Sequence, residues 1–365
     1  MLFRSFEWGA PPKKQGDYAY LLHIIRSMKS TGKAACILPH GVLFRGGAEA
    51  TLREALVRSG YIKGIIGLPP NLFYGTGIPA CILVLDKENA TSRRGIFMID
   101  ASKGFRKDGA KNRLREQDIH RIVDTFRRGT DVPGYARMVP FDEIADPRNA
   151  FNLNLPRYID TSDVEDIQDI DAHLKGGIPA RDVDALNAWW TVMPALRSQL
   201  FEEMRRGYLS LRLPVPTLKD TIEGHEEFRR FTTLAGETFA AWRGRTDSAC
   251  RAFGLDKHPK ELIEAISEDL LDAFRKVPLL DAYDVYQHLM DYWAETLQDD
   301  AYIIAASGWV AGAKPREIVK RKNKDGKLVW PEPGDYQIGK QRFASDLIPA
   351  RLMVARFFRA EQEKL

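Results

Sequence analysis

Two adjacent aromatic residues, Phe73 and Tyr74, stand in the short sequence PPNLFYGTGIP, residues 69–79. The apolar segments YIKGIIGL and ACILVL flank it, so we expect a loop joining two buried strands at the end of a sheet. Open α/β sheets bind ligands at their strand ends, where an aromatic pair can stack on a planar ligand. The alternative is that the loop folds both rings beneath the sheet, as connecting segments often bury a large side chain of their own.

A second candidate site follows the preceding predicted strand, in LPHGVLFRGGAE at residues 38–49. Arg45 stands beside Gly46 and Gly47 just before a predicted helix, and a guanidinium next to free backbone amides suits a phosphate or a carboxylate. Glycines in this position can equally be ordinary turn residues. Both loops follow strands, so we expect them side by side at the carboxyl ends of the sheet.

Other kinds of active site find no support in the sequence. The seven histidines are scattered, and neither a GxSxG nucleophile motif nor a complete GxxxxGK[ST] phosphate-binding motif occurs. Cys36, Cys81 and Cys250 are far apart and form no CxxC pair. We therefore predict buried, reduced thiols and neither a zinc site nor a disulfide.

The basic residues are unevenly distributed. Lysines and arginines number 54 against 50 acidic residues, and residues 310–365 alone hold 13 basic and seven acidic residues. The segment KPREIVKRKNKDGK, with Lys320, Arg321 and Lys322 at its centre, can contact nucleic-acid phosphates or form a solvated loop. No apolar run approaches the roughly 18 residues of a membrane span, and the amino terminus lacks a secretory signal, so we expect a cytoplasmic protein with no membrane partner.

The order of the predicted elements indicates an α/β fold in the first 160 residues. Helical and strand-like segments alternate, and several strands are continuous apolar runs, which is typical of a sheet covered on both faces. KAACILP, residues 33–39, is predicted to be a short buried strand, and Asp17 to cap the first helix. Two later strands follow each other without a helix, so at least one edge of the sheet should be antiparallel.

Beyond residue 160 the predicted elements are mainly helices. The acidic sequence DTSDVEDIQDID reads as a connector, so the expected domains are 1–160 and 161–365. The predicted helices are DVDALNAWWTVMPALRSQLFEEMRRG, EEFRRFTTLAGETFAAWRGRT, PKELIEAISEDLLDAFRKV, AYDVYQHLMDYWAETLQDD and ASDLIPARLMVARFFRAEQEKL.

The two loop sequences together resemble those of a known family. LPHGVLFRGGAEATLREALV followed by IKGIIGLPPNLFYGTGIPACILVLDK closely resembles the modification (M) subunit of type I restriction-modification systems, a family of S-adenosylmethionine-dependent DNA adenine N6-methyltransferases. MIDAS, FNLNLPRYID and LLDAYDVYQHLMDYWAETLQDD extend the resemblance over most of the chain. It implies that residues 1–160 are the carboxyl-terminal part of a mixed, Rossmann-like methyltransferase sheet, and that residues 161–365 dock other subunits and contact DNA.

The resemblance also implies roles for individual residues. The family extrudes the target adenine from the duplex, because the adenine N6 atom is not accessible inside the base stack. In this family the loop after the sixth strand lines the pocket for that base. Phe73 and Tyr74 match this loop, and we assign Asn71 to the same pocket. The expected DNA contacts are Arg45, Lys320, Arg321 and Lys322.

Two motifs on which the family's chemistry depends do not occur in the sequence. These are the donor loop D-P-x-x-G-[ST]-G and the catalytic N-P-P-[FY], so we assign no catalytic, cofactor-binding or metal-binding residue. SFEWGAPPKKQGDYAYLLHII resembles the family segment just after N-P-P-F, so the chain is expected to begin midway through the subunit and to leave a strand edge open. S-adenosylmethionine is expected in the complete enzyme and not in this chain alone. The expected partners are DNA, the missing amino-terminal half, the specificity subunit and the restriction subunit.

Two other functions are compatible with the sequence. A noncatalytic, DNA-associated interaction module could retain the docking helices, and an unrelated α/β enzyme could use Arg45 as an anion clamp. In the leading interpretation the final helix, from about Ala344 to Leu365, docks on the specificity subunit or packs on its own domain. Its apolar residues are Leu347, Ile348, Leu352, Phe357 and Phe358, with Arg351, Arg356 and Arg359 interleaved.

Overall fold

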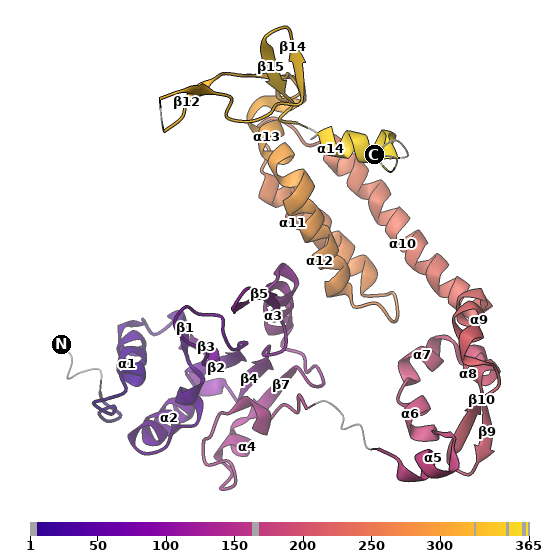
Figure 1. The fold of residues 1–365 in the computed structure, drawn as a ribbon. Helices are drawn as coiled ribbons and strands as arrows, with labels where there is room; N and C mark the ends of the chain where they lie inside the picture. Colours follow the sequence, from indigo (N-terminus) through magenta and orange to yellow (C-terminus); the bar gives the residue numbers. More distant parts are fainter. Residues whose placement is uncertain (1–5, 163–167, 325, 348–349, 360–362, 364–365) are drawn as a thin grey trace. The chain divides into compact units, whose positions relative to one another are not determined.

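The computed structural model describes residues 6–162, 168–324, 326–347, 350–359 and 363. Contacts divide the chain into two compact units, residues 1–167 and 168–365, and each is described by itself (Figure 1). Within the described ranges, no helix is both long and apolar enough to cross a membrane.

The first unit is built on a five-stranded mixed sheet with the strand order β1-β3-β2-β4-β7 (Figure 1). β2 and β4 are parallel, whereas the β1–β3, β2–β3 and β4–β7 pairs are antiparallel, so both edges of the sheet are antiparallel. The mixed α/β fold predicted from the sequence is confirmed. The strands are β1 (Lys33–Pro39), β2 (Ile62–Gly67), β3 (Ala80–Asp86), β4 (Gly95–Asp100) and β7 (Ala136–Pro140).

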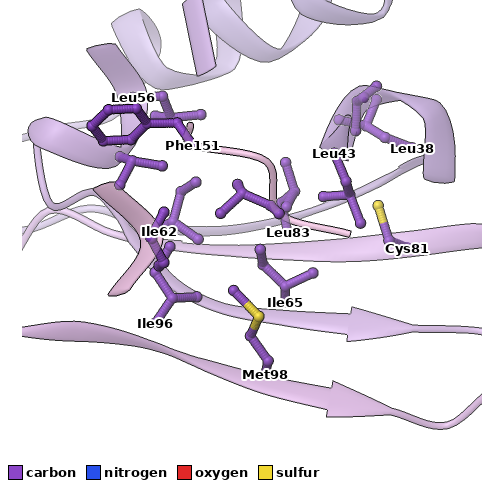
Figure 2. Close-up of a cluster of buried hydrophobic side chains, with 14 of the residues drawn as sticks. Leu38, Leu43, Leu56, Ile62, Ile65, Cys81, Leu83, Ile96, Met98 and Phe151 are labelled. Carbon is purple, nitrogen blue, oxygen red and sulfur yellow. The ribbon is translucent and has the colours of Figure 1, made fainter. Parts of the chain in front are cut away.

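Helices cover the central strands of this sheet on both faces. On one face the apolar side chains of α1 and α2 join those of β2, β3 and β4 in one continuous core (Figure 2). On the other face α3 packs on β2 and β4. Gly64 of β2 permits this approach, because a Cβ atom there would overlap the Phe126 ring of α3. The helices of this unit are α1 (Asp17–Ser27), α2 (Ala48–Arg58), α3 (Glu116–Arg128) and the short α4 (Phe141–Ala145).

The strand β1 is not the buried strand that the sequence predicts. Among the described strands it pairs only with β3, at the sheet edge; of its side chains only Leu38 is buried, and Ile37 is 55% exposed. Ile37 pairs in register with Ile82 of β3. Ile82 packs on the face of the sheet that α3 covers, but α3 does not extend over β1. A short apolar run fits a central or an edge strand equally, because its sequence does not reveal its neighbours.

The second unit is mainly helical, as the sequence predicts. α10, α11 and α12 share a core around Trp242, Leu271 and Tyr286, and the Trp242 indole donates a hydrogen bond to the Ile266 carbonyl at 2.9 Å. A π-helical segment, Trp293–Leu297, separates α12 from α13. The helices are α5 (Ile170–Lys175), α6 (Ala180–Asp184), α7 (Asn187–Val192), α8 (Pro194–Leu200), α9 (Leu218–Gly224), α10 (Glu226–Arg251), α11 (Pro259–Phe274), α12 (Ala282–Tyr292), α13 (Gln298–Gly312) and α14 (Ala350–Phe357).

Two parts of this unit form strands where the sequence predicts other structure. Residues 201–207, predicted to end a long helix, form β9 and the turn of the β9–β10 hairpin, with Gly207 at a φ of +80° in the turn. The final helix begins at Ala350, because Ala344 belongs to β15. In both places short alternating sequences compete with a helical period nearby. The strands are β8 (Ile178–Pro179), β9 (Phe201–Arg205), β10 (Tyr208–Leu211), β11 (Arg316–Ile318), β12 (Arg321–Lys322), β13 (Leu328–Val329), β14 (Tyr336–Ile338) and β15 (Gln341–Ala344).

Candidate functional site

The two loops that the sequence singles out lie at the same end of the sheet. Pro39, the last residue of β1, pairs with Ala80, and Gly67, the last residue of β2, pairs with Cys81. The loops after β1 and β2 therefore begin on either side of the start of β3. Gly67 is required here, because a side chain at this position would overlap Leu155.

The loop between β2 and β3, residues 68–79, exposes its aromatic pair. Tyr74 is 95% exposed and Phe73 is 40% exposed, whereas the neighbouring Leu72 packs against the apolar core under α3. Leu68 is thus the large side chain that this loop buries, with Leu72 partly buried beside the same core, and the alternative in which both rings fold beneath the sheet is wrong. Phe73 also lines a shallow apolar groove of about 230 Å³; other lining residues are Ile37, Ile78 and Pro79.

A small hairpin, in a segment where the sequence predicts only a polar loop, lies against the aromatic loop. It consists of β5 (Arg106–Asp108) and β6 (Lys111–Arg113). The sequence KDGAK does contain a signal for it, since a glycine between short polar strands favours a tight turn. Gly109 supplies the left-handed conformation of that turn, with a φ of +59°.

Hydrogen bonds from this hairpin fix the course of the aromatic loop. The Lys111 ammonium group donates to the Phe73 carbonyl oxygen at 2.6 Å. The Asn112 backbone amide donates to the Asn71 carbonyl oxygen at 3.0 Å, and the Asn112 side-chain amide donates to that of Pro70 at 2.7 Å. Hydrogen bonds from the β5–β6 hairpin to these carbonyl groups therefore fix the backbone from which the exposed rings project.

Asn71 shapes the loop through an unusual backbone conformation. Its φ is +58°, and its Oδ1 atom lies close enough to Gly77 that a Cβ atom there would be 3.0 Å away. The structure thus brings Asn71, Phe73 and Tyr74 together in one loop at the ligand end of the sheet. Their role in a base pocket stays a prediction.

Arg45 lies in the other loop, where it is engaged in ion pairs. Its Nη1 atom is 2.8 Å from the Asp17 carboxylate and 3.5 Å from that of Glu49, whose side chain is fully buried. Asp17 does not cap α1 as predicted, because Gly16 occupies the cap position and the carboxylate binds Arg45. Two carboxylates already balance the guanidinium charge, which weighs against the predicted DNA contact and against an anion clamp.

Buried polar groups tie the loop that contains Arg45 to the core. Arg53 of α2 donates to the carbonyl oxygens of Arg45 at 2.9 Å and Phe151 at 2.8 Å. The Tyr18 hydroxyl donates to another carbonyl oxygen of the same loop at 2.8 Å. Burial raises the pKa of Glu49 above its usual value, although Arg45 opposes the shift. The loop after β1 is therefore a structural connection, in which Arg45 and the carbonyl oxygens of Val42 and Arg45 already have partners.

His40, which follows β1 directly, is a half-buried polar residue that the sequence does not single out. Its Nε2 atom is buried and has no hydrogen-bond partner among the described residues. Burial lowers the pKa of His40, and the nearby Asp100 carboxylate opposes that shift. A neutral imidazole is thus held close to Gly67, where the aromatic loop begins. A lone histidine before a turn carries no sequence signal for such a position.

The other predicted DNA contacts belong to the second unit. Lys320, Arg321 and Lys322 are exposed, and the last two form β12, which pairs with β13. The segment is therefore not a plain loop. The Lys320 ammonium group lies 5.1 Å from the centre of the Trp330 ring. Contact of these residues with DNA stays a prediction.

The predicted docking helix is described in part. Phe357 and Phe358 are 65% and 55% exposed, whereas Leu347 is buried in a cluster with Trp293. Ile348 and the side chains of Arg351 and Leu352 lie outside the described residues. Arg356 is exposed, and Arg359 forms an ion pair with Glu363 at 3.0 Å.

S-adenosylmethionine, which the resemblance implies, would need glycines whose backbone amides can approach it closely. The glycines at this sheet end include Gly46, Gly47 and Gly75, and a Cβ atom on any of them would meet no atom within 4 Å. These three glycines therefore border open space. In the described part of the chain, no group of three or more His, Cys, Asp and Glu side chains could hold a metal ion.

Comparison with known proteins gives a family for the first unit. Residues 2–167 match the family model described as N-6 DNA Methylase. Over 167 residues the chain is 36% identical to the type I restriction enzyme MjaVII methylase subunit of Methanocaldococcus jannaschii, a match covering 45% of this chain and 28% of that protein. Over 165 residues it is 31% identical to the type I restriction enzyme HindI methylase subunit of Haemophilus influenzae, covering 44% of this chain and 37% of that protein.

A similar solved structure is the type I restriction-modification system methyltransferase subunit from Streptococcus thermophilus, with 40% identity and a TM-score of 0.40. That match covers 43% of this chain and 33% of the other. The chain thus matches 28% to 37% of the length of the two relatives named above. Residues 2–167 therefore match the N-6 DNA Methylase family model, and the proteins that they resemble include the methylase subunits of type I restriction enzymes.

Proposed function

We propose that this chain forms the carboxyl-terminal part of a type I DNA adenine N6-methyltransferase and supplies the aromatic wall of its target-base pocket. The observation that carries the proposal is the exposed pair Phe73 and Tyr74 at the ligand end of the sheet, in a segment of the N-6 DNA methylase family. Burial of one aromatic side chain contributes about 1.5–3 kcal/mol to stability, so an adjacent pair with one ring almost fully exposed and the other partly exposed needs a reason.

A flipped adenine provides that reason. A base that leaves the duplex loses its stacking and pairing, and stacking on an aromatic side chain returns about 1–3 kcal/mol. The apolar groove beside Phe73 extends the flat surface towards Ile37 and Ile78. Because the hairpin already holds the loop backbone, little conformational entropy is lost when the base binds.

Donor binding and methyl transfer must then come from outside residues 1–365. Neither the D-P-x-x-G-[ST]-G loop nor N-P-P-[FY] occurs in the sequence. We assign both tasks to a separate amino-terminal partner, which would bind S-adenosylmethionine. The β1 edge and the exposed Ile37 beside it support a docking surface for that partner, because free strand edges pair readily with another strand.

The second unit would provide contacts to DNA and to the specificity and restriction subunits. The exposed Phe357 and Phe358 favour docking of the final helix on another chain, and the exposed run Lys320–Lys322 favours phosphate contacts. The recognised DNA sequence would be read by the specificity subunit. The assembled enzyme would work in the cytoplasm.

The test is methyl transfer to duplex DNA by the assembled enzyme carrying F73A or Y74A. We expect each variant to lower the rate about tenfold, which corresponds to about 1.4 kcal/mol of lost stacking. The melting temperature should change little, since both rings are exposed. Y20A is the matched control, because Tyr20 is 73% exposed on α1 in the same unit, and its rate should be unchanged. A large fall in melting temperature with an unchanged rate per folded molecule would show that the rings are part of the core.

A second measurement separates this function from a noncatalytic DNA-associated module. Isothermal titration of the chain alone with S-adenosylmethionine should give no binding, and adding the amino-terminal partner should restore both donor binding and methyl transfer. A complex that binds DNA and docks its partners but transfers no methyl group would favour the module instead. Micromolar donor binding by the chain alone would mean that the cofactor site has been misplaced.

A further inference from the structure

The β5–β6 hairpin carries more positive charge than its own structure needs. Residues 106–113 include four lysines and arginines and a single aspartate. Arg113 lies 3.9 Å from that aspartate, Asp108, which is the outer limit of an ion pair. Arg106 and Lys107 are exposed, and no carboxylate in the described part of the chain pairs with either.

Two of these cations oppose each other across the strands. Arg106 of β5 pairs in register with Arg113 of β6, and both side chains are exposed. Like charges directly opposite each other in a sheet are destabilising, and a two-stranded hairpin is only marginally stable to begin with. The arrangement therefore opposes folding of the free hairpin, whereas a bound polyanion would remove the repulsion.

This charged hairpin lies immediately beside the exposed aromatic pair. Lys111 donates hydrogen bonds to the carbonyl oxygens of Phe73 at 2.6 Å and Thr76 at 3.4 Å, and its ammonium group is 6.0 Å from the centre of the Tyr74 ring. The buried Oδ1 atom of Asn112, also on β6, has no partner among the described residues. The cations and the rings thus belong to one connected surface.

We propose that the β5–β6 hairpin binds the phosphates of duplex DNA next to the base that the aromatic loop holds. The inference rests on the proposed function, and it deepens it by naming where the DNA backbone lies. A flipped nucleotide stays joined to its neighbours through two phosphates, so cations must lie close to any pocket that takes its base. Arg106, Lys107 and Arg113 are placed to supply them, and Lys111 is a positioning residue that couples this hairpin to the loop.

The test is the salt dependence of DNA binding by the full chain, measured by fluorescence anisotropy with a labelled duplex. The variant R106Q/K107Q/R113Q removes three charges from the hairpin. The control K13Q/K14Q/R127Q removes three exposed charges elsewhere in the same unit. Each phosphate contact contributes about 0.9 to the slope of log affinity against log salt, so the hairpin variant should flatten that slope by about two to three. Affinity at low salt should fall at least about tenfold, and the control should match the wild-type chain.

Three results would overturn this inference. They are a slope and affinity unchanged by the hairpin substitutions, the same loss in the control variant, and no DNA binding by the wild-type chain even at low salt. Competition by polyglutamate as effective as by duplex DNA would point to an acidic protein partner and would also contradict it. Failure here leaves the proposed function testable, because F73A and Y74A are scored by methyl transfer. Conversely, a hairpin that binds duplex DNA while F73A and Y74A methylate normally would support the inference and overturn the proposed base pocket.

Discussion

Two loops at one end of the sheet carry sequence signals of similar strength, yet their notable residues have opposite environments. Arg45 stands beside glycines before a helix but is drawn into ion pairs with Asp17 and Glu49. Phe73 and Tyr74 also stand among glycines, and they remain exposed. The difference comes from distant parts of the chain: α1 and α2 bring carboxylates to the first loop, whereas the β5–β6 hairpin binds only backbone carbonyl groups of the second.

The comparison shows how availability for a ligand is decided. The buried Glu49 carboxylate is costly unless a cation pairs with it, so Arg45 has a task in the fold itself. No comparable demand acts on Phe73 and Tyr74, because Leu68 and Leu72 already fill the space beneath their loop. Residue type and local spacing identify both loops as candidates, and long-range partners decide which one is free to bind.

The largest expected effect comes from removing the charge of Arg45. R45M leaves the buried Glu49 carboxylate without its nearest cation, and breaking such a pair in a buried setting costs about 3 kcal/mol. The measurement is urea denaturation followed by amide hydrogen exchange of the β2–β3 pair, which reports on the first unit alone. We expect the free energy of unfolding of this unit to fall by that amount.

Y74A is the counterpart of R45M in the other loop. Tyr74 is almost fully exposed, so its truncation should change the free energy of unfolding by no more than about 0.5 kcal/mol. The two loops would then differ as strongly in stability as they do in exposure. If R45M were tolerated as well as Y74A, Arg45 would not be the structural residue that its ion pairs indicate, and an anion-binding role would regain support.

A smaller effect is expected at Lys111, which holds the second loop from outside. K111M removes the hydrogen bonds to the Phe73 and Thr76 carbonyl groups, while K107M removes the same charge from the same hairpin without touching the loop. The Asn112 backbone amide donates to the Asn71 carbonyl oxygen, so its hydrogen-exchange rate reports on the contact between the hairpin and the loop. Its hydrogen exchange should become about fivefold faster in K111M, equivalent to about 1 kcal/mol for the lost bonds, and should stay near the wild-type rate in K107M. Equal rates in both variants would mean that charge, and not the link to the loop, stabilises the hairpin.

Much of the first unit follows from its sequence. Continuous apolar runs identify β2 and β4 as central strands, and PPNLFYGTGIP predicts the loop between β2 and β3, because glycines and prolines prevent regular structure; the exposure of its two rings is known only from the structure. The position of β1 at an edge does not follow, because KAACILP reads the same in either place. The partners of Arg45 also lie beyond prediction, since Asp17 is 28 residues away and only the packing of α1 brings it near.

The site was less predictable than the fold because the elements that hold its residues in place are short. The β5–β6 hairpin pairs only three residues on each strand, and nothing in GFRKDGAKNR says that it will contact residues 70–76. The strands β9 and β10 are not predictable for a similar reason, since FEEMRRGYLSLRL continues a helical pattern before apolar and polar residues begin to alternate. Short elements carry too few residues to establish a period, so tertiary contacts decide their form.

The smallest expected effect is a pH dependence that separates the two loops electrostatically. Burial raises the pKa of Glu49, so the folded protein holds a proton on this carboxyl group more tightly than the unfolded chain does. The folded state therefore binds more protons in the window above the ordinary glutamate value of 4.5, and stability falls as pH rises through that window. E49Q cannot ionise and should lack this slope, so its free energy of unfolding relative to the wild-type chain should increase from about pH 4 to about pH 7. E54Q removes a glutamate charge from the surface of the same helix, where Glu54 is partly exposed beside Arg58, and is the matched comparison variant. An E49Q difference that stays constant with pH would mean that Arg45 offsets the cost of burying this carboxylate completely, and the first loop would then be as free of electrostatic strain as the second.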